Sequence, residues 1–183
     1  MMQELTGKVV AVTGASRGLG EAMAVGFSRA GADLALMART AEDLDRVAAR
    51  CRQAGAGRVI SVPMDVTAET DVQSAFERIV TELGGLDVVI ANAGVAASSL
   101  GAPHMRKLES YSSDVALRIL QVNTLGVWLC MKAAFSRMPR GGSFLAVSSE
   151  LGSRPGPGGG ILAVSKAGVN ALVAIAVAEQ AEA

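Results

Sequence analysis

The stretch Thr13–Gly20, with the sequence T-G-A-S-R-G-L-G, joins a short apolar run, Lys8–Val12, to a segment with helical periodicity. Three glycines in this spacing let a strand turn sharply into a helix. We expect Gly14 to make the turn, Gly18 to leave space for a phosphate, and Gly20 to let the helix lie close to the sheet. A helix that starts in such a loop presents free N–H groups to an anion. The stretch therefore predicts a strand, a phosphate-binding turn and a helix; a turn without a ligand is the alternative.

Short aliphatic runs alternate with longer helical segments along the whole chain. Strands are expected at residues 8–12, 33–38, 58–64, 86–91 and 143–148, and helices at 19–30, 40–54, 67–83, 110–137 and 163–179. This alternation is typical of βαβ units around a parallel sheet. A chain of 183 residues with 50% hydrophobic residues can bury one core, and no linker divides it. We therefore expect an α/β fold and a single domain over residues 1–183.

Local signals add detail to the expected helices. Thr40 and Asp43 resemble a capping box, and Thr67 stands where it would cap the helix after the third strand. In the first helix, Leu19 and Met23 belong to an apolar stripe that should face the core.

Composition argues against several classes of function. Seventeen basic and seventeen acidic residues cancel, which favours neither nucleic acid nor an anionic membrane as a partner. Cys51 and Cys130 are expected to be buried thiols, and no metal-binding pattern is present in the sequence. The first strand begins close to Met1 without a leader pattern, and the apolar run Ala171–Ala178 is too short to span a bilayer. These observations predict a cytoplasmic protein.

Further motifs follow the glycine stretch in a fixed order. Asp65-Val66 follows the third strand, Asn92-Ala93-Gly94 follows the fourth, and Asn123 lies in the middle of a helix. Ser149 directly follows the fifth strand, and Lys166 lies in the last helix. This ordered set resembles the short-chain dehydrogenase/reductase family from Lys8 to the end of the chain.

The resemblance implies a Rossmann-like, doubly wound parallel sheet of about five strands in the order 3-2-1-4-5. It implies an oxidoreductase that acts on a small-molecule carbonyl or alcohol with a nicotinamide cofactor. Its catalytic residues would be Ser149 to polarise the carbonyl, Lys166 to hold the ribose and Asn123 to position a water. The cofactor-binding residues would be Gly14, Ser16, Arg17, Gly18, Leu19, Gly20, Arg39, Asp65, Val66, Asn92, Ala93, Gly94 and Lys166.

The charge after the second strand bears on the choice of cofactor. Sites that prefer NAD place an acid there to bond the ribose 2′-hydroxyl, but this chain reads Ala38-Arg39-Thr40. Arg39, together with Arg17 in the glycine stretch, would suit a 2′-phosphate instead. The sequence therefore favours NADP(H).

Each candidate also has a purely structural interpretation. Arg17, Arg39 and Lys166 could be surface charges, and Ser149 could cap a turn. Asn123 could hold a water or a carbonyl, and Asp65 could form a turn with Thr67.

One family residue is replaced. The family's Y-x-x-x-K motif would place a catalytic tyrosine four residues before Lys166, where this chain has Leu162. Leucine carries no transferable proton, so carbonyl reduction should be weakened unless another acid serves. His104 and Tyr111 are the nearby candidates.

Two alternatives to a working oxidoreductase follow from Leu162 and from the length of the chain. One is a non-catalytic NADP(H)-binding or scaffold protein, and the other is a fragment of a longer reductase. The fifth strand would form an exposed sheet edge, so association with another copy, as a homo-oligomer, is expected.

Overall fold

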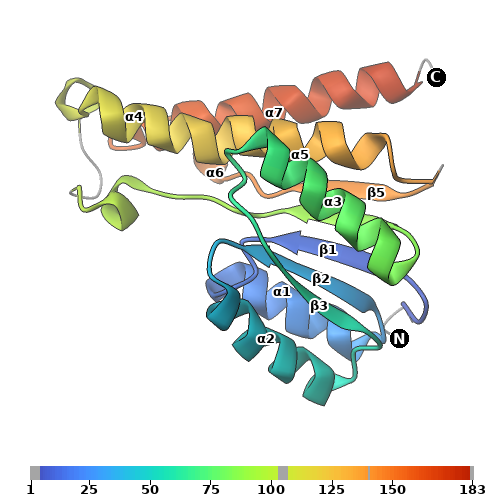
Figure 1. The fold of residues 1–183 in the computed structure, drawn as a ribbon. Coiled ribbons are helices and arrows are strands. Elements are labelled where there is room, and N and C mark those ends of the chain that lie inside the picture. Colours follow the sequence, from blue (N-terminus) through green and yellow to red (C-terminus); the bar gives the residue numbers. More distant parts are fainter. Residues whose placement is uncertain (1–4, 103–106, 140, 182–183) are drawn as a thin grey trace. The chain divides into compact units, whose positions relative to one another are not determined.

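The computed structural model describes residues 5–102, 107–139 and 141–181 (Figure 1). The chain divides into two compact units. Unit 1 contains residues 1–93 and 129–145, and unit 2 contains residues 94–128 and 146–183.

A five-stranded sheet forms the centre of unit 1. Its strands are β1 Val9–Thr13, β2 Asp33–Ala38, β3 Val59–Pro63, β4 Val88–Ala91 and β5 Ser143–Ala146. Their order is β3-β2-β1-β4-β5, which confirms the predicted topology. The pairings of β1 with β2, of β1 with β4 and of β2 with β3 are parallel. Their carboxyl ends therefore lie at one edge of the sheet, where ligands bind in this architecture.

Helices cover the sheet because its strands are apolar on both faces. Val10 and Val12 of β1 are fully buried, and the alternate residues Val9 and Ala11 belong to a cluster of buried apolar side chains. That cluster includes residues of α3 (Glu69–Leu83) and the unit 1 part of α5 (Gly126–Phe135). The remaining helices of unit 1 are α1 (Gly18–Arg29) and α2 (Ala41–Ala54), which pack against each other and against β2.

The prediction that the apolar stripe with Leu19 and Met23 faces the core is wrong for α1. The buried residues of α1 are Gly20, Ala24 and Ser28, which recur every four residues, whereas Leu19 is 58% exposed. The helix turns its smallest side chains inward, so its backbone approaches its neighbours closely.

The side-chain capping predicted for two helices is also wrong, although Thr40 does stand at the start of α2 as predicted. Thr40 occupies the N-cap position of α2, but its side chain makes no capping hydrogen bond. The N-cap of α3 is Ala68, and the Thr67 hydroxyl donates to Asp65 Oδ1 at 2.7 Å instead.

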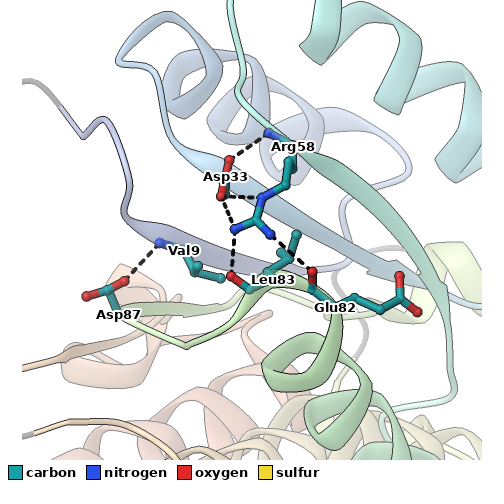
Figure 2. A network of polar contacts seen from close by, with 6 residues as sticks. All are labelled: Val9, Asp33, Arg58, Glu82, Leu83 and Asp87. Atoms are coloured by element: carbon teal, nitrogen blue, oxygen red, sulfur yellow. Dashed lines mark hydrogen bonds and ion pairs between the residues drawn. The ribbon is translucent and has the colours of Figure 1, made fainter.

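A polar network ties the amino-terminal ends of two strands to the end of α3 (Figure 2). The buried carboxylate of Asp33 accepts hydrogen bonds from Arg58 Nε at 2.9 Å and Nη2 at 2.6 Å, and from the Arg58 backbone N–H at 2.6 Å. The same guanidinium donates to the carbonyls of Glu82 and Leu83. Arg58 therefore satisfies the carboxylate and the last carbonyls of α3 together.

Unit 2 is mainly helical. Its elements are η1 Ala97–Leu100, η2 Leu108–Ser110, α4 Ser113–Leu120, η3 Gln121–Leu125, the first residues of α5, α6 Glu150–Ser153 and α7 Gly160–Ala181. The single helix predicted over residues 110–137 is interrupted, because η3 is a π-helical turn between α4 and α5. Such turns often occur at functional sites.

The last helix is longer than the sequence predicted. It begins at Gly160, and Gly160–Gln180 is long and apolar enough to cross a membrane by length and composition, with 28% of the tested window buried in the structure. The argument from the run Ala171–Ala178 therefore does not exclude a membrane span. Core helices of water-soluble proteins pass the same test.

Candidate functional site

Thr13 and Asn92 anchor the glycine loop in unit 1. The Thr13 hydroxyl, at the end of β1, accepts hydrogen bonds from the N–H groups of Asn92 at 3.0 Å and Ala93 at 2.9 Å. The Asn92 side chain in turn donates to the carbonyls of Thr13 at 2.9 Å and Gly14 at 3.3 Å. The structure thus brings together two motifs that lie almost eighty residues apart.

The three glycines of the loop have different surroundings. Gly14 has φ +65°, and a Cβ there would lie 2.9 Å from the Ala93 Cα. A Cβ at Gly20 would lie 2.2 Å from the Gly14 carbonyl oxygen, so its close contact is with the loop itself. Gly18 has φ +59°, but no heavy atom lies within 4 Å of its Cβ position. Gly14 and Gly20 are therefore required by packing, whereas the surroundings of Gly18 leave room for a ligand.

The start of α1 can bind an anion. Among the residues that the structure describes, no acceptor takes the N–H of Gly18, Leu19 or Gly20. Arg17 and Arg39 are both exposed, and no partner for either side chain is found within the described part of the chain. Free N–H groups at a helix N-terminus, open space at a glycine and two unpaired guanidinium groups fit the pyrophosphate and phosphate groups of a dinucleotide.

Sequence reasoning missed a second contact of this loop. Arg46 Nη2, on α2, donates to the Ser16 carbonyl at 2.7 Å, and Arg46 also pairs with Glu21 at 3.0 Å. Arg50 contacts the same carboxylate. An arginine that is eight residues past the end of β2 gave no sequence signal for this contact, because it depends on how α2 packs beside α1.

Asp65 and Val66 follow β3 at the same sheet edge. Asp65 Oδ1 accepts from both the N–H of Thr67 at 2.9 Å and its hydroxyl at 2.7 Å, which forms a local turn. Val66 is half-buried against the apolar cluster of α3 and α5. The turn presents the backbone of this pair at the edge where β1 and β2 also end.

Asn123 is the most constrained candidate in unit 2. It is fully buried in the π-helical turn, where its Oδ1 accepts from Val95 N at 2.8 Å. Its Nδ2 donates to Val95 O at 2.9 Å and to Ser165 Oγ at 3.1 Å. Both amide hydrogens are therefore used to join the segment after Gly94 to α7.

Lys166 contacts the segment after β5, which also carries Ser149. Lys166 is 8% exposed, and its Nζ donates to the Val147 carbonyl at 2.6 Å. Burial lowers the pKa of the Lys166 ammonium below its ordinary value. Ser149 caps α6, because its Oγ accepts from the Leu151 N–H at 3.3 Å. The hydroxyl hydrogen of Ser149 thus remains available to an acceptor such as a carbonyl oxygen.

Close packing fixes α6 against α7. A Cβ at Gly152 would lie 2.7 Å from the Lys166 carbonyl carbon, and the Ser148 hydroxyl donates to the Lys166 carbonyl at 3.2 Å. Leu162, half-buried in the first turn of α7, accepts a hydrogen bond at its carbonyl from Ser165 Oγ at 2.7 Å. Ser149, Asn123 and Lys166 therefore belong to one compact unit, and His104 lies outside the described residues.

The profile of the short chain dehydrogenase family matches residues 8–183. The chain belongs to the short-chain dehydrogenase/reductase family. Among its relatives in this family, a short-chain dehydrogenase/reductase of Armillaria gallica is 33% identical over 177 residues, which cover 94% of this chain and 65% of that protein. An uncharacterized oxidoreductase of Methylorubrum extorquens is 32% identical over 181 residues, with 98% of this chain and 70% of that protein covered.

Solved structures of this family have the same fold. The alcohol dehydrogenase of Thermococcus sibiricus, in complex with 5-hydroxy-NADP, has a TM-score of 0.86 and 34% identity over 94% of this chain and 71% of that one. NAD⁺-bound xylitol dehydrogenase has a TM-score of 0.90 and 27% identity over 98% of this chain and 67% of that one. The chain thus spans about two thirds of the length of these family members.

Proposed function

We propose that the chain is an NADP(H)-dependent oxidoreductase that interconverts a small carbonyl compound and its alcohol. The observation that carries this proposal is the glycine loop, with its open Gly18 position and the free N–H groups at the start of α1. Bound there, the nicotinamide cofactor supplies or accepts the hydride of the reaction.

The preference for NADP(H) rests on two arginines. Arg39 directly follows β2, where an NAD-specific site would place an acid, and Arg17 opens α1. Both guanidinium groups are exposed and unpaired within the described ranges, so no ion pair within those ranges has to break before they contact a 2′-phosphate. The Thermococcus sibiricus enzyme is bound to 5-hydroxy-NADP and xylitol dehydrogenase to NAD⁺, so the preference of this chain depends on its own charges.

The remaining cofactor contacts are assigned by position. We propose that Gly14, Ser16, Gly18, Leu19 and Gly20 surround the pyrophosphate. We assign the adenine to Asp65 and Val66, and the adjoining ribose to the backbone at Asn92, Ala93 and Gly94.

Ser149 and Lys166 have hydrogens to offer the reacting groups. The Ser149 hydroxyl would donate to the substrate carbonyl oxygen, because its own oxygen already accepts from Leu151. One of the three Lys166 hydrogens is bound by Val147, which leaves two for the hydroxyls of the nicotinamide ribose. Asn123 would hold Val95 and Ser165 in place. It would not donate to a water, because both of its amide hydrogens are already donated to these two residues.

Cofactor titration tests the proposal. Binding of NADPH and of NADH to the purified chain would be measured by nicotinamide fluorescence and by the increase in melting temperature that binding to the folded state must cause. Arg39→Asp should weaken NADPH binding at least about tenfold without weakening NADH binding, because it replaces a phosphate partner with a repelling carboxylate. Arg29→Gln, at an exposed arginine of α1, is the matched control. Failure of the native chain to bind either nucleotide would refute the proposal.

We further propose that two copies of the chain associate. β5 is an edge strand of the sheet, and Leu145 on it is 50% exposed. Exposed strand edges pair readily with other chains. Sedimentation equilibrium should give a mass above the 18.6 kDa of one chain, and a monomer at micromolar concentration would contradict this.

A further inference from the structure

Carbonyl reduction needs a proton for the alcohol oxygen, and the first turns of α7 lack the expected donor. Leu162 stands four residues before Lys166 and carries no transferable proton. Tyr111, the chain's single tyrosine, lies in the same compact unit as Ser149 and Lys166. The inference below rests on the proposed oxidoreductase function and supplies the residue that it lacks.

The hydroxyl end of Tyr111 lies against the first residue of α7. A Cβ built on Gly160 would lie 2.3 Å from Tyr111 Oη and 2.7 Å from its Cε2 and Cζ. Gly160 has φ +52°, a conformation that glycine adopts readily. The absence of a side chain at Gly160 therefore makes the space in which the phenol is seated.

Gly159, which directly precedes α7, adjoins the segment that carries Ser149. A Cβ at Gly159 would lie 3.5 Å from Leu151 Cδ2, and Leu151 donates its N–H to Ser149 Oγ. Six residues along α7 from Gly160, the backbone of Lys166 packs against α6. Gly159 and the first two turns of α7 thus contact the phenol, the segment that carries Ser149, and α6.

The Tyr111 hydroxyl is free to act. The side chain is half-buried, and no hydrogen-bond partner for its hydroxyl exists among residues 5–102, 107–139 and 141–181. A phenol both donates and accepts hydrogen bonds, which suits a group that must give a proton in reduction and take it back in oxidation.

We propose that Tyr111 is the general acid of this enzyme in place of the residue replaced by Leu162. In reduction, the carbonyl carbon gains a hydride and the C=O π electrons move to oxygen. That oxygen takes the proton from Tyr111 Oη, and the phenolate regains a proton from water. Overall, the ketone, NADPH and one proton become the alcohol and NADP⁺. In oxidation the phenolate accepts the alcohol proton.

The test begins with Tyr111→Phe, which removes only the hydroxyl. Reduction of a panel of simple aliphatic and aromatic ketones and aldehydes would be followed through NADPH consumption. Loss of the acid should lower kcat by about 10²- to 10⁴-fold, with NADPH affinity unchanged. Adding Leu162→Tyr to Tyr111→Phe should restore part of the activity, because it returns a phenol to the first turn of α7.

A second readout does not depend on turnover. Because the chain has one tyrosine, labelling with 3-fluorotyrosine gives a single ¹⁹F resonance, which would be recorded with and without cyclohexanone and acetophenone. A donor that contacts the carbonyl should shift this resonance when ketone is added, whereas a tyrosine with a purely structural role should not.

The outcomes separate the two proposals. A native chain that binds NADPH and reduces carbonyls, with Tyr111→Phe equally active, would overturn the role of Tyr111 and leave the proposed function intact. An unshifted ¹⁹F resonance would also overturn it. A native chain that binds no nucleotide and reduces no carbonyl would refute the proposed function, and the role of Tyr111 with it.

Discussion

Substituting alanine separately at Gly18 and Gly20 should separate the folding of the glycine loop from its ligand binding. At Gly20 the new methyl group would lie 2.2 Å from the Gly14 carbonyl oxygen and 2.6 Å from Asn92 Nδ2. At Gly18 it would meet no atom within 4 Å. The two substitutions add the same group to the same loop, so each serves as the control for the other.

The expected free energies differ in size and in kind. Gly20→Ala forces backbone atoms apart and should lower the free energy of unfolding by about 3 kcal/mol or more. Gly18→Ala meets only the strain of a left-handed backbone, about 1–2 kcal/mol. However, its methyl group would occupy the space assigned to the pyrophosphate, so NADPH affinity should fall at least about tenfold, or 1.4 kcal/mol.

Urea unfolding followed by far-ultraviolet circular dichroism would measure the first quantity, and fluorescence titration with NADPH the second. The reasoning fails if Gly20→Ala is as stable as the native chain. The assignment of Gly18 to the ligand fails if Gly18→Ala stays folded and binds NADPH with native affinity.

Three further predictions concern stability and pH. Arg58→Met should lower the free energy of unfolding by about 2 kcal/mol, because buried Asp33 loses its charged donors; a loss below about 0.5 kcal/mol in urea unfolding would contradict this. Burial raises the pKa of the Cys130 thiol to about 12. Cys130 should therefore react with a thiol reagent at about pH 8 after unfolding but not before, as measured by mass spectrometry. Partial burial by itself would raise the pKa of the Asp87 carboxyl. The hydrogen bond from the Val9 N–H and the ammonium group of Lys8 outweigh it and lower that pKa below its ordinary value of 3.8. Its stabilising effect, measured against Asp87→Asn in thermal unfolding, should be present above pH 3.8 and disappear as the pH falls through the lowered pKa; a difference that persists in acid would refute this.

Much of the fold could be predicted from the sequence because the deciding signals are local. The alternation of apolar runs and helical segments predicted the parallel sheet, and the resemblance to a family supplied its strand order, which the structure confirms. Strand bounds differed by up to two residues, as for β5, which ends at Ala146 and not at Ser148. Helix ends at Gly55 and Gly84 were predictable because glycine adopts the left-handed conformation that both caps require.

The orientation of elements and the partners of side chains were decided by tertiary structure. The buried face of α1 is the one with Gly20 and Ala24, because the space between that helix and its neighbours admits only small side chains. Asn123 bonds to Val95 and Ser165, which are 28 and 42 residues away, and no local pattern specifies such partners.

The candidate site shows the same division. The sequence located the glycine loop, Ser149 and Lys166 as motifs, because each is defined by neighbours a few residues away. No such local motif predicts that Tyr111 lies against Gly160. The two residues are 49 positions apart, and their contact exists only because the folded chain packs the start of α7 against the short segment between η2 and α4.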